Sequence, residues 1–450
     1  MSTTKTGANS QKPGSKAWLM FIIIFIMCFI TPILWFSAPP LHNSIAGLLV
    51  NGKFMHEPGY DVFKDSLSNQ ALFGQTMSLI GLFALFSALV AGPLVKKLGV
   101  RPVMIFGVLL VVISAVVSAL SGSDYNILCA GRALLGLAVG FIWVSSPTAL
   151  SFWFREKNRA LAMSLWGACV PLGSLAATNL IVNPMLKAGI EFHMIWWVMA
   201  GMSGVATLLV ILIYRDPQKE EGSEVSTQAL PFKEIWPVLK QHQLFMVFIA
   251  WMSFTFINST FTSYNVSFFQ DSLKMDYLAA NRWASIAAGA GICAPVFGFI
   301  ADRINRCRRW ILVSIGVLCL VLTGIFGFHV SLGPVTGGAI MAIYLVVQFA
   351  ANGILIAVIR PYIPMLVGRG GVTAVSLGLS MLTLLQFGIQ FFTAPVFGGI
   401  QDAAVAAGAS SAEAWAAAAN FGIIPLGIVA LVCTFFIRQK PPASAPQENK

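Results

Sequence analysis

Twelve apolar stretches dominate this sequence, and each is long enough to cross the hydrocarbon core of a bilayer, which takes about 20 residues. Only 10% of the 450 residues are charged, against roughly 25% in soluble domains. The sequence therefore predicts an integral membrane protein with no soluble domain. The stretches begin near Trp18, Gln70, Pro102, Asn126, Ala160, Phe192, Leu244, Asn281, Trp310, Val335, Gly371 and Glu413. Ser68, just before the second stretch, is the expected N-cap of the helix that this stretch forms.

The basic residues are distributed unevenly among the loops. When the amino terminus is placed inside the cell, Lys and Arg gather on that side, in both tails, in the central loop and in the clusters at Lys96 and Arg155. Basic residues are retained in the cytoplasm, so both termini are predicted to be cytoplasmic, in a plasma or inner membrane. This bias accounts for the formal charge of +11, and nucleic acid is not expected as a partner.

A cluster of charges interrupts the apolar stretches in the second half of the chain. Residues 298–309 read GFIADRINRCRR, and residues 92–101 read GPLVKKLGVR, a degenerate copy in the first half. The duplication predicts an all-α membrane protein with twelve transmembrane helices in two pseudo-symmetric six-helix halves. The expected parts are a cytoplasmic tail at 1–17, a six-helix bundle at 18–214, a cytoplasmic linker with an interfacial helix at 215–243, a six-helix bundle at 244–437 and a cytoplasmic tail at 438–450.

Polar side chains recur on one face of some stretches and are nearly absent from others. The seventh stretch carries Thr255, Thr262 and further polar residues at helical spacing, whereas the third, sixth, ninth and twelfth are apolar on nearly every side. Such an alternation is expected when some helices line a central cavity and others face lipid, which is the layout of a transporter. Packing by Trp and interhelical hydrogen bonding by Asn and Thr are the structural alternatives. The candidate substrate-binding residues are Arg132, Trp35, Trp143, Asn258, Thr262, Asn265, Tyr344, Gln348, Asn352, Gln386 and Gln390.

Arg132 lies about two turns into the fourth stretch, where an unpaired charge costs at least roughly 2.5 kcal/mol. It therefore needs a strongly accepting or anionic partner. Backbone carbonyls are the accepting partner if the role of Arg132 is purely structural. A bound anionic substrate is the partner if Arg132 takes part in binding. The corresponding position in the second half is Gly338, so the second half has no equivalent of this positive charge. A cavity with one unbalanced arginine favours a small organic or inorganic anion.

These motifs resemble those of the major facilitator superfamily over the whole chain. Gly298, Asp302, Arg303 and Arg306 resemble the gating loop of that family, in which an acid and bases latch neighbouring helices on the cytoplasmic side. The first copy keeps Gly92 and Arg101 but has Lys96 where the motif has its acid. Residues 131–140, GRALLGLAVG, resemble the fourth-helix motif of the family, with Arg132 as its arginine. The resemblance implies the twelve-helix fold and function as a monomer.

The run that ends WFREKNRALAMSLWGACVPLG at Gly173 is also similar to the cyanate and nitroimidazole type of small-anion transporter. The chain is thus expected to be a secondary active transporter of a small anion that works by alternating access, with H⁺ or Na⁺ as a possible symported ion. Efflux of amphipathic drug-like compounds is the alternative that the aromatic-rich stretches support. A membrane receptor or sensor that binds its ligand without transporting it is the second alternative.

No enzyme motif is found in the sequence. It contains no phosphate loop, no metal-ligand cluster, and no Ser or Cys nucleophile with a suitable His and acid at membrane depth. Catalysis, cofactors and metals are therefore not expected, and the energy for transport has to come from a gradient of another solute or from that of the substrate itself. The expected partners are a small-molecule substrate and the lipid bilayer.

Overall fold

We describe a computed structural model of the whole chain. The structure describes residues 15–45, 69–122, 124–154, 162–163, 165–216, 241–271, 273–293, 296, 307–323, 359, 363, 366 and 371–437.

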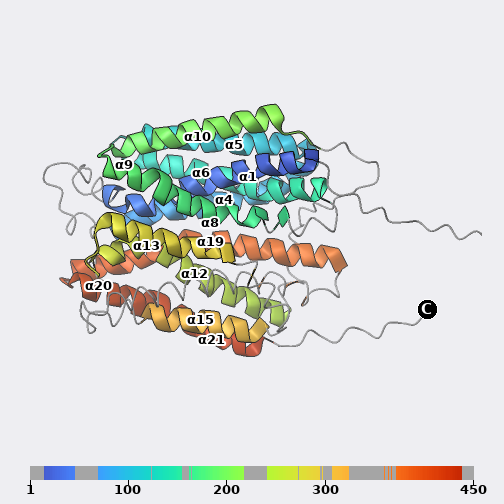
Figure 1. Cartoon of the computed structure of the whole chain (residues 1–450). Coiled ribbons are helices and arrows are strands. Elements are labelled where there is room, and N and C mark those ends of the chain that lie inside the picture. Colours follow the sequence, from blue (N-terminus) through green and yellow to red (C-terminus); the bar gives the residue numbers. More distant parts are fainter. Residues whose placement is uncertain are drawn as a thin grey trace, which may run out of the picture.

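The first half of the chain forms one helical bundle, drawn in blue to green in Figure 1. Helices α4, α5 and α6 pack on one another, and α1 and α10 cover them. The fifth membrane crossing, residues 165–187, is composed of α8, η2 and α9 in succession. The elements of this half are α1 (Ser15–Trp35), η1 (Pro39–Leu41), α4 (Gln70–Leu98), α5 (Val100–Ala119), α6 (Tyr125–Trp153), α8 (Cys169–Ala176), η2 (Ala177–Val182), α9 (Asn183–Lys187) and α10 (Phe192–Ile213).

The second half forms a separate bundle, drawn in yellow to red in Figure 1. Its long helices α12 and α19 lie against each other, and α12 also packs against α21. Helix α19 joins the halves, because it packs along α4 of the first bundle. The elements are α12 (His242–Asp271), α13 (Tyr277–Gly289), η3 (Ala290–Cys293), α15 (Cys307–Thr323), α19 (Gly371–Ala406), α20 (Ser411–Ala418), η8 (Ala419–Ile423) and α21 (Ile424–Phe436).

Within the described residues, nine helices are long and apolar enough to cross a membrane. Their outward faces carry exposed apolar side chains, such as Leu180 at 74% and Phe421 at 75% exposure, as expected for surfaces in contact with lipid. The predicted helix starts at Gln70 and Phe192 coincide with the observed ones. The predicted linker at 215–243 lies almost wholly outside the described residues, so the boundaries of the two bundles stay a prediction.

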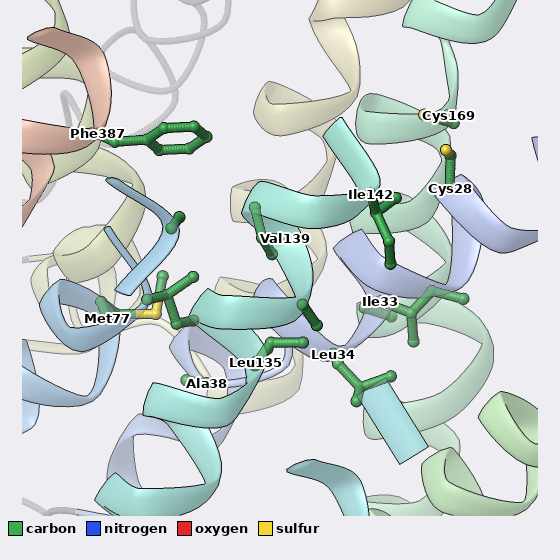
Figure 2. Packing of buried hydrophobic residues seen from close by; sticks show 14 of the residues in the cluster. Cys28, Ile33, Leu34, Ala38, Met77, Leu135, Val139, Ile142, Cys169 and Phe387 are labelled. Atoms are coloured by element: carbon green, nitrogen blue, oxygen red, sulfur yellow. The ribbon is translucent and has the colours of Figure 1, made fainter. Parts of the chain in front are cut away.

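Glycines set the close approach of α6 to α4. A Cβ added at Gly136 would lie 2.6 Å from the carbonyl oxygen of Ile80, and one at Gly140 would lie 2.6 Å from that of Ala84. Small residues let helix backbones approach in this way. Figure 2 shows the apolar layer that results, with Met77 of α4 beside Leu135 and Val139 of α6.

Two helices widen into a π-helical turn just before a proline. Segment η2 precedes Pro184, and η8 precedes Pro425. Proline lacks a backbone N–H and its ring clashes with the carbonyl four residues earlier, and a wider turn relieves that clash. Thr178 and Asn179 of η2 lie beside the second bundle, since Thr178 lines a cavity together with residues of α12 and α13 and Asn179 bonds to Ser285.

Candidate functional site

A small cavity of about 20 Å³ lies between the two bundles, enough for about one water molecule. The first bundle contributes Ser174 and Thr178, together with the chain just after α1. The second bundle contributes Thr262, Asn265 and Asn281 from α12 and α13. The cavity is thus formed by both halves, and hydroxyl and amide groups make up the polar part of its wall.

One seam of hydrogen bonds between the bundles borders this cavity, near the end of α1 and the start of α13. The Tyr277 hydroxyl donates to the carbonyl oxygen of Pro40, and Asn281 Nδ2 donates to the same oxygen over 3.3 Å. Asn281 Nδ2 also lies 3.0 Å from Asn183 Oδ1, and Asn179 Nδ2 donates to Ser285 Oγ over 2.8 Å. All four bonds join one bundle to the other.

A second seam joins α4 to α19 at the same end of the molecule. The Asp402 carboxylate of α19 accepts hydrogen bonds of 2.9 Å from the backbone N–H groups of Gln70 and Ala71. The Tyr264 hydroxyl lies between the carbonyl oxygens of Gln70 and Ala394, at 2.8 and 2.7 Å. The backbones meet closely here, because a Cβ at Gly398 would lie 2.5 Å from the carbonyl carbon of Gln70.

Arg132 is fully enclosed in the first bundle, with 1% of its surface exposed. Its Nε donates to the carbonyl oxygen of Thr76 over 3.1 Å, its Nη1 to that of Leu34 over 2.7 Å, and its Nη2 to that of Trp35 over 2.8 Å. Its guanidinium carbon lies 5.7 Å from the centre of the Trp196 ring, a cation–π distance. Arg132 therefore ties α6 to α1, α4 and α10, and it is not among the residues that line the cavity.

The local sequence explains why α1 needs this arginine. The carbonyl of Trp35 would accept from the N–H four residues later, but that residue is Pro39, which has none. Carbonyls at the end of a helix carry partial negative charge and attract cations. The alternative of a structural role, supported by backbone carbonyls, thus has direct geometric support, while a contact of Arg132 with substrate stays a prediction.

Seven of the other candidate substrate-binding residues lie on α1, α6, α12 and α19. Thr262 and Asn265 line the cavity, and Asn258 lies one turn earlier on α12, where its carbonyl accepts from the Thr262 hydroxyl over 2.8 Å. Trp35 stacks on Phe36, with 5.6 Å between ring centres, and Trp143 packs edge-on against Trp166 at 5.1 Å. Gln386 and Gln390 lie half-buried on α19. Tyr344, Gln348 and Asn352 lie outside the described residues.

The predicted gating residues fall in two groups. Gly298, Asp302, Arg303 and Arg306 lie outside the described residues, so the cytoplasmic latch stays a prediction. In the first half, the Arg101 guanidinium donates to the carbonyl oxygen of Ile211 over 3.0 Å. The backbone N–H of Arg101 donates to Asp216 Oδ2 over 3.1 Å. These bonds hold the start of α5 to the end of α10 within one bundle.

Several residues of the seams were missed by sequence reasoning. Tyr264, Tyr277 and Asp402 bind backbone groups of a helix far away in the chain, and no residue pattern marks which carbonyl or N–H needs a partner. Asp402 had one available signal, since it is an isolated acid at the end of the eleventh apolar stretch. The expected N-cap Ser68 lies outside the described residues, and the structure has Asn69 at the N-cap of α4.

The family model of the Major Facilitator Superfamily matches residues 20–385. The inner membrane transport protein YajR of Escherichia coli is 27% identical over 173 residues, which cover 38% of this chain and 37% of YajR. The glucose transporter GlcP of Staphylococcus epidermidis is 26% identical over 295 residues, which cover 58% of this chain and 64% of GlcP. The matches thus span less than two thirds of the length of these relatives.

Two solved structures share the fold. A bacterial homologue of the human lysosomal transporter Spinster superposes with a TM-score of 0.67 at 13% identity, over 95% of this chain and 97% of the other. The nucleoside transporter NupG superposes with a TM-score of 0.69 at 14% identity, over 92% of this chain and 98% of NupG. At these identities the likeness concerns the fold.

Proposed function

Because this chain belongs to the Major Facilitator Superfamily, we propose that it carries a small polar solute across the membrane by alternating access of its two bundles. The observation that carries the proposal is the cavity between the bundles, since residues of both halves line it. In this structure the cavity holds about one water molecule, so the solute enters only when the halves rock apart and widen the site toward one side of the membrane.

The lining favours a neutral solute rich in hydroxyl groups. Ser174, Thr178, Thr262, Asn265 and Asn281 offer hydroxyl and amide groups that both donate and accept hydrogen bonds. In the described part of the lining there is no charged side chain. Sugars and polyols match such a surface, and the glucose transporter GlcP and a probable polyol transporter of Arabidopsis thaliana are among the similar proteins.

A small anion is the second candidate substrate. Among the described residues the Arg132 guanidinium has no carboxylate within salt-bridge distance, so its charge is met by carbonyl oxygens, the Met77 sulfur and the Trp196 ring, none of which carries a full negative charge. The positive potential that remains favours anions in the neighbourhood. A putative glycerol-3-phosphate transporter of Arabidopsis thaliana is also among the similar proteins. The argument for an anion is weaker, because the lining of the cavity does not include Arg132.

The orientation follows from the predicted topology. Helix α1 begins, and α21 ends, at the same end of the molecule, on the right in Figure 1, and the predicted positive-inside bias makes that end cytoplasmic. Both seams lie at the opposite end. We therefore assign the structure to a state that is closed toward the outside, in a plasma membrane, with a gradient of H⁺ or Na⁺ as the proposed energy source.

Ligand-induced thermal stabilisation tests the substrate class. The purified protein is melted with D-glucose, mannitol, glycerol 3-phosphate, nitrate and ethidium, because a ligand that binds only the folded state raises the melting temperature. We expect a sugar or polyol to raise it. Stabilisation by nitrate or glycerol 3-phosphate alone would favour the anion, and stabilisation by ethidium alone would favour the efflux of amphipathic compounds. Stabilisation without flux into proteoliposomes would favour a receptor.

A further inference from the structure

Helix α4 begins without a cap of its own. Its N-cap residue, Asn69, has a left-handed backbone with φ of 62°, and its side chain makes no capping hydrogen bond. The first N–H groups of a helix have no partner within the helix, and they carry partial positive charge. The start of α4 therefore needs an acceptor from elsewhere in the molecule.

The acceptor comes from the opposite bundle. Asp402 of α19 binds the N–H groups of Gln70 and Ala71 with one carboxylate oxygen each, both at 2.9 Å. A charged acceptor makes such bonds stronger than a neutral one does, and a carboxylate at a helix N-terminus is further stabilised by the helix dipole. One side chain thus supplies the cap that α4 lacks, and supplies it across the boundary between the halves.

Further contacts hold Gln70, whose backbone N–H the carboxylate binds, and keep α4 close to α19. The Tyr264 hydroxyl reaches the carbonyl oxygen of Gln70 from the same bundle as Asp402, and the Gln70 side chain is held by His42 Nε2 at 3.0 Å. A Cβ at Gly74 would lie 2.6 Å from the carbonyl carbon of Ala394. The two helices can therefore approach closely enough for the Asp402 side chain to span the gap.

We propose that Asp402 is a gating residue of the transport cycle, whose carboxylate caps α4 from the opposite bundle and so stabilises the state closed at this end. The proposal rests on the proposed function, because only a protein that alternates needs the bond to open. Water can replace both partners when the bundles separate, since the N–H groups and the half-buried carboxylate then become hydrated. The bond is consequently strong enough to bias the equilibrium and is still reversible.

This gate differs in chemistry from the gate that the sequence predicts. The predicted latch around Asp302 and Arg303 pairs acids with bases and lies at the cytoplasmic end. Asp402 instead binds a helix N-terminus, with no basic side chain within salt-bridge distance of it among the described residues. The two ends of the transporter would therefore be fastened by different interactions.

Hydrogen–deuterium exchange of the purified protein tests the proposal without any substrate. Two segments are followed by mass spectrometry, the first turn of α4 and the first turn of α13, which lies in the other seam around Tyr277. In Asp402→Asn we expect exchange to rise at least about tenfold in both segments, because the loss of charge-assisted bonds shifts the whole molecule toward the open state. A rise confined to α4 would mean a purely local cap and would overturn the proposal, as would unchanged exchange in both segments.

Asp216→Asn is the matched control. Its carboxylate accepts the backbone N–H of Arg101 near the start of α5 over 3.1 Å, but donor and acceptor belong to one bundle. Exchange should rise at the start of α5 and stay unchanged in α13, and an equal rise in α13 would contradict the account.

If Asp402→Asn is not recovered folded, Tyr264→Phe replaces it in the same experiment. This change removes the hydroxyl between Gln70 and Ala394, so both segments should exchange faster, by a smaller factor. Unchanged exchange in α13 would again overturn the proposal. Flux of the wild-type protein into proteoliposomes is measured separately. Absence of flux would contradict the assignment as a transporter, whereas flux together with unchanged exchange in α13 would contradict only the gating role of Asp402.

Discussion

Arg132 caps helix α1, because its Nη2 donates a hydrogen bond of 2.8 Å to the carbonyl oxygen of Trp35. Pro39 removes the N–H that this carbonyl would otherwise use, so the break in α1 and the buried charge in α6 depend on each other. The arginine of the fourth-helix motif thus holds α6 to α1, α4 and α10 within the first bundle.

Replacing this arginine should lower stability even when no substrate is present. Arg132→Gln removes the charged donor from the carbonyls of Thr76, Leu34 and Trp35, of which the Leu34 carbonyl keeps a bond of 2.7 Å from the Ser37 hydroxyl. We expect a loss of about 3 kcal/mol in the free energy of unfolding, the scale for buried acceptors that lose a charged donor. Thermal melting in detergent should therefore show a fall of several degrees.

Arg101→Gln is the control for this change, since Arg101 donates one side-chain bond, to Ile211, nearer the surface. It should lower the melting temperature less. A variant at Arg132 that melts like the wild type and loses saturable anion uptake would contradict the structural role and favour the contact with substrate.

The glycines of α6 should tolerate no side chain. In Gly136→Ala the new methyl group would lie 2.6 Å from the carbonyl oxygen of Ile80, so α4 and α6 must move apart. We expect a destabilisation of about 1–3 kcal/mol from this overpacking, measured as a lower melting temperature. Gly201→Ala in α10 meets nothing within 4 Å and should be neutral or stabilising, because Ala favours helix over Gly by about 1 kcal/mol. Equal effects of the two changes would argue against the packing described here.

The hydroxyl groups of the cavity should contribute to substrate affinity. Thr178→Val keeps the shape of the side chain and removes the hydroxyl of a residue that lines the cavity. We expect the KM for uptake to rise about fivefold to tenfold, the effect of one hydrogen bond, with kcat and melting temperature little changed.

Thr207→Val is the matched control for the cavity variant. Its hydroxyl bonds to the carbonyls of Ser203 and Val108 within the first bundle, away from the cavity. Its KM should equal that of the wild type, and a KM unchanged in Thr178→Val as well would place the substrate elsewhere.

The closing seam around Tyr277 offers a further prediction. Tyr277→Phe removes the hydroxyl that binds the carbonyl oxygen of Pro40 and leaves Asn281 as the other donor to that oxygen. We expect the closed state to become less populated by roughly fivefold, the scale of one neutral hydrogen bond. Faster hydrogen exchange in the first turn of α13 would show this, and unchanged exchange would mean that the bond does not hold the seam.

The sequence predicts the helices of this protein better than it predicts their partners. The lengths of the apolar stretches follow from the thickness of the bilayer, and the positions where two of these stretches begin predicted the helix starts at Gln70 and Phe192. The polar face of α12 likewise indicated Thr262 and Asn265, which do line the cavity. Both inferences depend on residue type and spacing along one helix.

The partners of Arg132 and Asp402 could not be predicted in the same way. Both side chains bind backbone groups, which every residue has, and which of these groups lacks a partner depends on Pro39 in one case and on the uncapped start of α4 in the other. The contacts also depend on how two distant helices are placed. The charge on Arg132 was correctly expected to need acceptors, while the kind of acceptor came from the three-dimensional arrangement.

Uptake into proteoliposomes tests the central claim most directly. Purified protein is reconstituted, and the initial uptake of labelled D-glucose, mannitol, nitrate and glycerol 3-phosphate is compared with that of protein-free liposomes. We predict saturable uptake of a neutral polyhydroxylated solute, weakened in Thr178→Val and kept in Thr207→Val. Saturable uptake of the anions alone, unaffected by Thr178→Val, would contradict the assignment of the solute to the cavity between the two bundles.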